Sequence, residues 1–239
     1  MLPDQVRPAL LWELKLDAAG KNYASEVSRA LVRSREQLTY EGVQRALDDG
    51  SASEVLVLLK EVGLLREQRE KARGGVSLPI PEQEVVATGD QWELAFRSPL
   101  PVEGWNAQIS LMTGMAAAHM MLYAQVGILH TLPPADQGSL RKLRTTAKAL
   151  GIVWPAEMGY PEFVRSLDPN NTVHAVMLNA CTMLFRGAGY TAFSGSIPEH
   201  VEHAALAVEY AHCTAPLRRL VDRYVGEICV AICAGTPVP

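Results

Sequence analysis

The amino-acid sequence predicts an α+β protein with β-strands early in the chain and a mainly helical second half. Two patterns support this fold class. Apolar and polar residues alternate over 10–17 and 25–33, which is the period of half-buried strands, and Ala18-Ala19-Gly20 forms a turn between them. After residue 40 the apolar residues recur with the period of amphipathic helices. A chain of 239 residues is long enough to bury a sizeable core as one domain.

The same two periods predict the remaining elements. A short helix is expected from Tyr40 to about residue 49. A second helix, with Val55 and Leu58 on its apolar stripe, is expected to begin at a capping box of Ser51 and Glu54 and to end near residue 73. Further on, the sequence predicts strands at 76–80 and 91–97, a long central helix at 106–126, and helices at 136–150, 162–167, 173–185 and 217–234.

Composition and charge narrow the function classes. The chain has 22 Lys and Arg against 26 Asp and Glu, a formal charge of −4. This excludes a nucleic-acid binder that works by bulk positive charge, but not a local basic groove. The longest apolar stretch, 114–129, is interrupted by His119 and Gln125 and is too short to span a membrane. With four unevenly spaced cysteines and no export signal, we expect a cytoplasmic protein with reduced thiols and no membrane partner.

The segment 210–224 is the most informative part of the chain. Pro216 suits the first position of a helix, which places Arg218 and Arg219 in the first helical turn. Cations at this position oppose the helix dipole. Two explanations remain open. Backbone N–H groups and both guanidinium groups converge on a phosphate, or the arginines are a solvated pair with unrelated acidic partners.

Three segments carry a resemblance to a known family. TAPLRRLVD (214–222) is similar to the T-S-P-I-R-R-Y-x-D motif of the ribonuclease II (RNB) family of processive 3′→5′ exoribonucleases. RALVRSREQLTYEGVQ (29–44) resembles the family's R-S-x-I-R-S-x-x-R-L-T-Y-E-x-V, and Arg73-Gly74-Gly75 to Pro81-Glu82 resembles its R-G-A-x-D-F-x-x-P-E. The segments occur in the family's order and at about its spacing.

The resemblance implies an activity and a set of site residues. The intact family enzyme uses Mg²⁺ to hydrolyse single-stranded RNA to nucleoside monophosphates. By resemblance, Arg218 contacts the scissile region and stabilises charge on the phosphate, and Arg219 supports the path of the RNA backbone. Tyr40 corresponds to the tyrosine that positions the 3′-terminal nucleotide, although its spacing alone favours a core-facing residue. Asn106 stands where the family has a Glu-Glu pair, so it can hydrogen-bond a base or sugar but cannot act as an anion.

Departures from the family motifs are equally informative. The metal-binding aspartates of the family, D-x5-D-x-D-D, are absent from this sequence. Its one pair of adjacent aspartates, Asp48-Asp49, is interpreted as a solvated helix end. Leu78 replaces a stacking aromatic, and Ala215 replaces a serine suited to capping a helix. We therefore expect residues 1–239 to be a single partial RNB domain, the C-terminal portion of a catalytic domain. It lacks the N-terminal acidic cluster and any C-terminal OB-fold module, and alone it is expected to bind no metal and to be inactive.

Other interpretations remain. The chain could be a non-catalytic RNA-binding remnant or a purely structural module that binds no RNA. A zinc site built from Cys229, Cys233 and upstream histidines is disfavoured, because two cysteines in an apolar helix are typical core thiols. The basic runs 66–73 and 141–148 are interpreted as solvated polar faces of helices, although either could flank an RNA channel.

Overall fold

The computed structural model describes residues 4–89 and 91–239 and confirms the α+β class. The strands are β1 (Val6–Leu16), β2 (Asn22–Arg33), β3 (Glu82–Thr88), β4 (Gln91–Arg97), β5 (Val126–Thr131), β6 (Gly189–Ser194), β7 (Glu202–His203) and β8 (Val208–Glu209). The helices are α1 (Tyr40–Asp49), α2 (Glu54–Arg73), α3 (Pro101–Tyr123), α4 (Gln137–Ala149), α5 (Tyr160–Arg165), α6 (Thr172–Cys181), the 3₁₀-helix η1 (Thr182–Phe185) and α7 (Leu220–Ala234).

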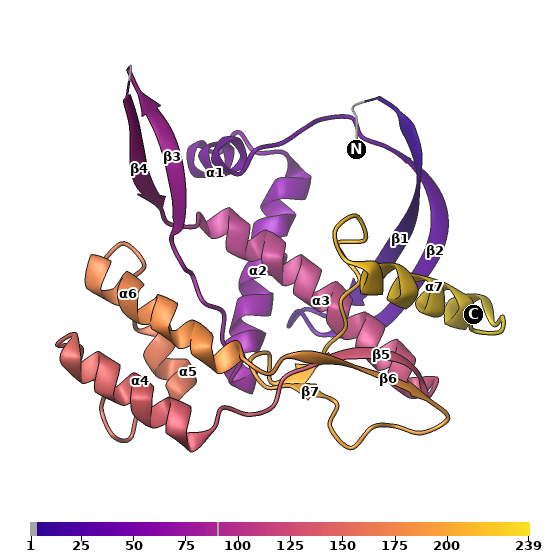
Figure 1. Cartoon of the computed structure of the whole chain (residues 1–239). Coiled ribbons are helices and arrows are strands. Elements are labelled where there is room, and N and C mark those ends of the chain that lie inside the picture. The colour runs from indigo at the N-terminus through magenta and orange to yellow at the C-terminus, as the bar shows by residue number, and fades with distance from the viewer. Residues whose placement is uncertain (1–3, 90) are drawn as a thin grey trace.

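Helix α3 runs through the centre of the molecule (Figure 1). The β1–β2 hairpin and α7 lie to one side of it, α4, α5 and α6 form a separate group on the other, and the β3–β4 hairpin projects from the molecule. The central position predicted for this helix is confirmed, because most of its residues from Met112 to Met121 are buried. No helix in the described part of the chain is long and apolar enough to cross a membrane.

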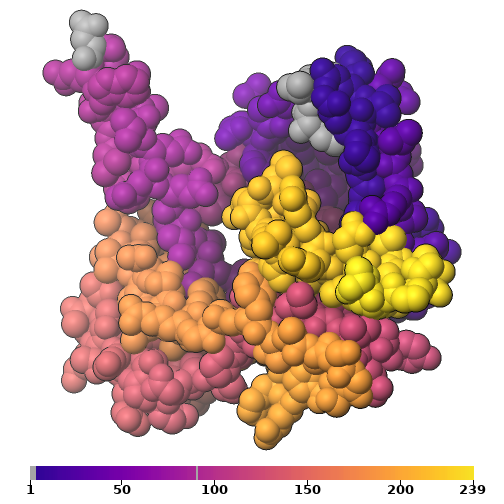
Figure 2. All heavy atoms as spheres, turned by 45° about the vertical axis from the view of Figure 1, so that its right-hand side comes forward, coloured from indigo at the N-terminus to yellow at the C-terminus, as the bar shows by residue number. Residues whose placement is uncertain are grey.

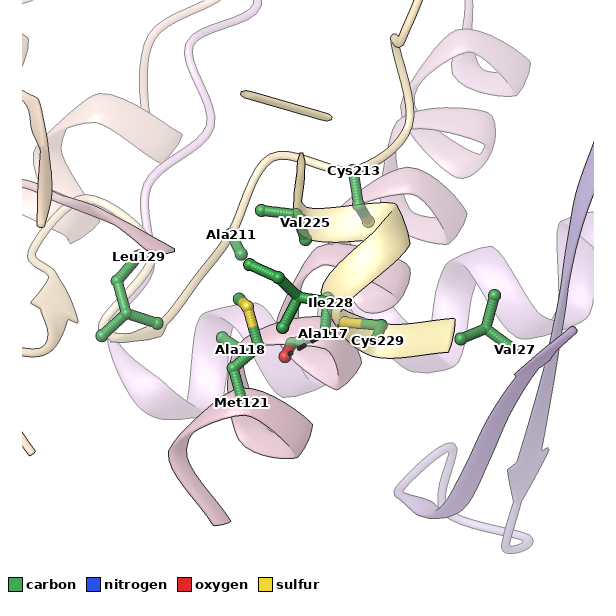
Figure 3. Packing of buried hydrophobic residues seen from close by; sticks show 10 residues of the cluster. All are labelled: Val27, Ala117, Ala118, Met121, Leu129, Ala211, Cys213, Val225, Ile228 and Cys229. Atoms are coloured by element: carbon green, nitrogen blue, oxygen red, sulfur yellow. Dashed lines mark hydrogen bonds between the residues drawn. The ribbon is translucent and has the colours of Figure 1, made fainter. Parts of the chain in front are cut away.

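The largest core cluster joins α3 to α7. In Figure 3, Ala117 and Met121 of α3 face Ile228 and Cys229 of α7. The cluster also takes in one residue each from β2 and β5 and two from the segment before α7. Its buried members are Val27, Ala117, Ala118, Met121, Leu129, Ala211, Cys213, Val225, Ile228 and Cys229. All four cysteines are free thiols, as the sequence predicts.

The β1–β2 hairpin covers one side of α7. Its strands pair antiparallel with Trp12 opposite Val27, and the predicted turn contains Gly20 with a φ of +69°. A β-carbon at Gly226 would lie 2.6 Å from Cδ1 of Leu10, closer than real contacts allow. The glycine in α7 therefore lets the helix rest directly on the hairpin.

Helix α2 is rotated from the face that its apolar stripe predicts. Val55 and Leu58 are 74% and 48% exposed, whereas Gly63, Arg66 and Glu70 are buried. The reason is the crossing with α3, where a β-carbon at Gly63 would lie 2.4 Å from Cβ of Trp105. The predicted stripe is therefore confirmed in part: its other members, Leu59, Val62 and Leu65, are half-buried, and the crossing at Gly63 adds Arg66 and Glu70 to the buried face.

Several predicted element boundaries are wrong. The capping box is not formed, because the N-cap of α2 is Ser53, without a side-chain hydrogen bond. Residues 76–80 do not form a strand, and β3 begins at Glu82 instead. Helix α3 begins five residues earlier than predicted, at Pro101, because the carboxylate of Glu103 accepts a hydrogen bond from the Leu100 N–H at 2.8 Å and starts the helix there.

The strands β5 and β6 were not predicted. They pair antiparallel with Leu129 opposite Thr191. The two strands are far apart in the sequence, since β5 begins at residue 126 and β6 at residue 189. The N–H of His130 also donates to the carbonyl of Tyr210 at 2.8 Å, which fixes the segment before α7 against this ladder.

Close packing at Gly114 fixes the same segment against α3. The N–H of Ala211 donates to the Gly114 carbonyl at 3.1 Å. A β-carbon at Gly114 would lie 2.1 Å from Cε2 of Tyr210 and 2.5 Å from the Ala211 carbonyl oxygen. Only glycine allows residues 210–214 to lie this close to the helix.

We predict that Gly114→Ala lowers the free energy of unfolding by about 1–3 kcal/mol, because the new methyl group overpacks against backbone. Urea denaturation measures this change. Gly104→Ala is the matched control on the same helix, since its β-carbon would meet only the flexible Glu67 side chain at 3.2 Å. Equal stability of the two variants would contradict this account of the contact.

Candidate nucleic-acid interface

Two hydrogen bonds place distant segments on one face of α3. Nδ2 of Asn106 donates to the hydroxyl of Tyr40 at 3.0 Å. The hydroxyls of Ser110 and Thr214 lie 2.7 Å apart. Asn106 and Ser110 are one helical turn apart, so they share a face. The start of α1 and the segment 214–219 are therefore brought side by side along the first half of α3.

Tyr40 opens α1 and is not a core residue. The hydroxyl of Thr39 caps the helix by accepting from the Gly42 N–H at 3.1 Å, which sets Tyr40 at the first helical position. Its side chain is 42% exposed, so the core-facing interpretation of its spacing is wrong. Tyr40 and Asn106 line a cavity of about 300 Å³ with an apolar wall that includes Leu56 and Val102.

The loop before α7 differs from the predicted helix start. Helix α7 begins at Leu220, so Arg219 is the N-cap and Arg218 lies in a turn before the helix. The cause is Asp222, which is 1% exposed and accepts from the Ala215 N–H at 2.7 Å. This bond folds residues 215–218 back on themselves. Ala215 is therefore not at the capping position, and the actual N-cap of α7, Arg219, makes no side-chain capping hydrogen bond.

The two arginines of this loop have different roles. Arg219 donates from Nε and Nη2 to the two carboxylate oxygens of Asp222 at 2.8 and 2.9 Å, a bidentate pair. Its acidic partner is therefore part of the same motif. Arg218 is exposed, and its side chain makes no hydrogen bond or ion pair within residues 4–89 and 91–239. Of the two guanidinium groups that the sequence places together, only that of Arg218 is free to meet an anion.

The carboxyl of Asp222 stays ionised despite its burial. Burial by itself raises the pKa of Asp222, but the hydrogen bonds from Arg219 and from the Ala215 N–H outweigh it and hold this pKa below the ordinary value for aspartate. The ionised carboxylate therefore fixes the loop that carries Arg218.

Figure 2 shows that the molecule is hollowed next to this loop. The hollow lies between the projecting β3–β4 hairpin at the upper left and the C-terminal part of the chain in yellow. The hollow is open to solvent between these two parts of the molecule. Tyr40 and Asn106 offer a phenol ring and an amide on one face of α3, and the loop that meets this face at Ser110 carries the exposed Arg218. Such groups bind bases, sugars and phosphate.

The described residues do not fit a divalent metal. Between residue 4 and the C-terminus, residue 90 excepted, no group of three or more His, Cys, Asp or Glu side chains could hold a metal ion. Asp48 and Asp49 are helix-end residues: Asp48 accepts from Gln44 at 2.9 Å, and Asp49 from the Ser51 N–H at 2.9 Å. No reaction step is therefore assigned to a metal on these residues.

A cluster of aromatic and histidine rings surrounds His212, in the segment before α7, and was not predicted from the sequence. The rings of His130 and His212 stack with centroids 4.1 Å apart, and the ring of His203 lies 5.0 Å from that of His130. The hydroxyl of Tyr190 lies 2.9 Å from Nδ1 of His212. These residues come from β5, β6, β7 and the segment before α7, so no local pattern in the sequence could have grouped them.

A match to a family model shows which protein family the chain belongs to. The model of the RNB domain matches residues 1–234. The chain belongs to the RNB domain family. Comparison with curated proteins gives no significant match.

Solved structures of other proteins share the fold of this RNB domain. RNase R of Mycoplasma genitalium, in complex with ribose-methylated single-stranded RNA, is similar with a TM-score of 0.74 and 17% identity, over 94% of this chain and 37% of that one. Yeast Ssd1, described as a pseudonuclease, is similar with a TM-score of 0.72 and 17% identity, over 100% of this chain and 30% of Ssd1. An active-site mutant of the Dss1 exoribonuclease from Candida glabrata is similar with a TM-score of 0.64 and 12% identity, over 99% of this chain and 30% of Dss1. The chain spans about a third of the length of these proteins.

We predict that Asp222→Asn lowers the free energy of unfolding of this RNB domain by about 1.5–3 kcal/mol, because it weakens charge-assisted bonds to a buried carboxylate. Urea denaturation provides the measurement. Glu227→Gln is the control on the same helix, because Glu227 pairs with Arg29 where both side chains are solvent-accessible. If the two variants lose the same stability, Asp222 does not hold the loop.

We also predict that stability falls as the pH is lowered from about 6.5 towards 4. Burial lowers the pKa of both His203 and His212 to about 4, and the nearby His130 adds to the effect. In the unfolded chain these imidazoles titrate near 6.5, so the unfolded state binds more protons within this window. Thermal unfolding at pH 7 and pH 5 is expected to show a loss of several degrees. The loss should be smaller for His212→Gln, and equal losses would contradict the assignment.

Proposed function

We propose that this chain binds single-stranded RNA along the first half of α3. The 3′-terminal nucleotide lies against Tyr40 and Asn106, and a backbone phosphate lies against Arg218. The observation that carries this proposal is the pair of hydrogen bonds, Tyr40 to Asn106 and Ser110 to Thr214, which bring both segments to one face. Stacking on an aromatic ring contributes about 1–3 kcal/mol per base, and arginine binds phosphate with charge-assisted hydrogen bonds.

We further propose that the chain acts as the C-terminal portion of an RNB catalytic domain that shortens RNA from its 3′ end and releases nucleoside monophosphates. The order of the three family motifs and the similarity to RNase R over 37% of that protein support this role. Hydrolysis in the family relies on Mg²⁺, and carboxylates outside the described residues would have to hold it. Here Arg218 would stabilise charge on the phosphate.

A second candidate function is RNA binding without hydrolysis. It is favoured by the similarity to Ssd1, which is described as a pseudonuclease. The presence of Asn106-Ala107, where the family has two glutamates, favours it as well. The two candidates share the RNA-binding face and differ only in whether the metal-bound carboxylates are supplied.

The first test concerns the isolated chain, for which both candidates predict the same result, and the second separates them. The purified chain is incubated with 5′-labelled single-stranded RNA and Mg²⁺ or Mn²⁺, and we expect binding without shortening. Stepwise loss of 3′ nucleotides would contradict this and assign hydrolysis to the chain itself. Translation of the DNA upstream of Met1 tests the role in a larger enzyme. An open frame encoding D-x5-D-x-D-D supports the exoribonuclease, and an in-frame stop codon supports the non-catalytic protein.

We predict that Arg218→Gln weakens the binding of single-stranded RNA by a similar factor for every sequence. It should also reduce the slope of log K against log salt by about 1, because one phosphate contact is lost. Fluorescence anisotropy at several salt concentrations measures both quantities. The control is Arg186→Gln, another exposed arginine, at the end of η1. An Arg218→Gln variant that binds like the control would contradict the proposed contact.

A further inference from the structure

A second cavity lies on the other side of α3. It measures about 400 Å³, is open to solvent, and is lined by the second half of α2, the start of β2, the second half of α3 and β8. Its α3 residues lie on roughly the opposite side of the helix from Asn106 and Ser110. The lining divides into a polar and cationic wall (Lys21, Asn22, Arg66, Arg69, Arg73 and His119) and a mainly apolar floor (Ala72, Met112, Met115, Ala116 and Val208).

Arg66 is buried in this wall without a carboxylate partner. Arg66 is only 5% exposed, so the prediction that it lies on a solvated helix face is wrong. Nη1 donates to the Gly20 carbonyl at 2.9 Å and Nη2 to the sulfur of Met115 at 3.3 Å. Nε has no hydrogen-bond partner among the described residues. A buried guanidinium with no counter-ion is costly, and a bound anion would remove that cost.

The neighbouring cations are also incompletely neutralised. Nη2 of Arg73 is buried without a hydrogen bond in the described part of the chain, and its nearest carboxylate oxygen, on Glu70, is 4.0 Å away. Neither Lys21 nor Arg69 forms an ion pair with any described residue. Burial, followed by the charges of Arg73 and Arg69, lowers the pKa of Arg66 to about 10, and the charge of Glu70 opposes this shift only in part. The wall therefore carries an excess of positive charge.

The acidic groups around the cavity are engaged elsewhere. Glu70 accepts from Nε2 of Gln108 at 2.6 Å. An oxygen of Glu209 lies 3.3 Å from Nε2 of His119 at the other end of the wall. Asp17 accepts from the Lys21 N–H at 2.8 Å as part of the β1–β2 turn. This hydrogen bond lowers the pKa of Asp17, and the charges of Arg69 and Lys21 contribute to lowering it without forming an ion pair with the carboxylate. None of the three forms an ion pair with Arg66.

We propose that this cavity, which we call the Arg66 cavity, binds a phosphate-bearing ligand of the size of a mononucleotide. The phosphate would be held by Arg66, Arg69 and Lys21, and the apolar floor would take a planar ring. Oδ1 of Asn22 is buried without a partner among the described residues, so it can accept a hydrogen bond from a ligand hydroxyl or amine. A volume of about 400 Å³ is within the ordinary range for small-molecule sites. Either a free nucleotide or a phosphorylated RNA end presents this chemistry.

Calorimetric titration of the full chain with AMP tests the proposal. We expect AMP to bind, and adenosine, which lacks the phosphate, to bind at least about tenfold more weakly. The double variant Lys21→Gln and Arg69→Gln should lose at least about tenfold in AMP affinity. It changes residues that are not fully buried, and its melting temperature checks the fold. Lys71→Gln, an exposed lysine of α2 outside the cavity, is the matched control and should bind AMP normally.

Three results would overturn the proposal: no AMP binding, equal affinity for AMP and adenosine, or unchanged binding by the double variant. Tyr40→Ala separates this site from the RNA-binding face. AMP binding that is lost in Tyr40→Ala but kept in the double variant would place the nucleotide at Tyr40 and also overturn the proposal. Oligoribonucleotides with and without a 5′-phosphate identify the source. Competition with AMP by the phosphorylated form alone points to an RNA end, and competition by neither points to a free nucleotide.

Discussion

The close contact between α3 and the segment 210–214 sets the geometry of the proposed RNA-binding face. At Gly114 the backbone of Ala211 lies against the helix through a hydrogen bond of 3.1 Å, which a side chain at this position would prevent. From that contact the chain continues to Thr214, whose hydroxyl meets Ser110. The loop carrying Arg218 is therefore fixed relative to Asn106 and Tyr40 by packing as well as by polar contacts.

Of the two adjacent arginines in this region, one is neutralised by a buried carboxylate and the other is exposed to solvent. Asp222 is buried and neutralises Arg219, which stabilises the turn before α7. Arg218 remains exposed. On the other side of α3, Arg66 is buried without such a partner. Arg219 is thus neutralised by Asp222, Arg218 is exposed to solvent, and Arg66 is buried with a nitrogen that has no hydrogen-bond partner among the described residues.

The sequence predicts those parts of the fold that depend on local pattern. The β1–β2 hairpin, α1 and the central position of α3 follow from residue periodicity, and the family motifs point to Tyr40, Asn106, Arg218 and Arg219. The rest depends on contacts between distant residues. The rotation of α2 is set by Gly63 against Trp105, the start of α7 by Asp222, and the β5–β6 pairing by segments far apart in sequence. The burial of Arg66 has the same origin, because the polar pattern of 66–73 alone resembles a solvated helix face.

The most direct test of the central claim is photo-crosslinking of single-stranded RNA that carries 4-thiouridine as its 3′-terminal nucleotide, followed by mass spectrometry of the modified peptides. The account predicts crosslinks to the peptides that contain Tyr40 or Asn106. When 4-thiouridine is placed one or two nucleotides upstream, the crosslinks should move towards residues 214–219. Crosslinks from the 3′ end to the α4–α6 group or to the β3–β4 hairpin, with none at Tyr40 or Asn106, would contradict it.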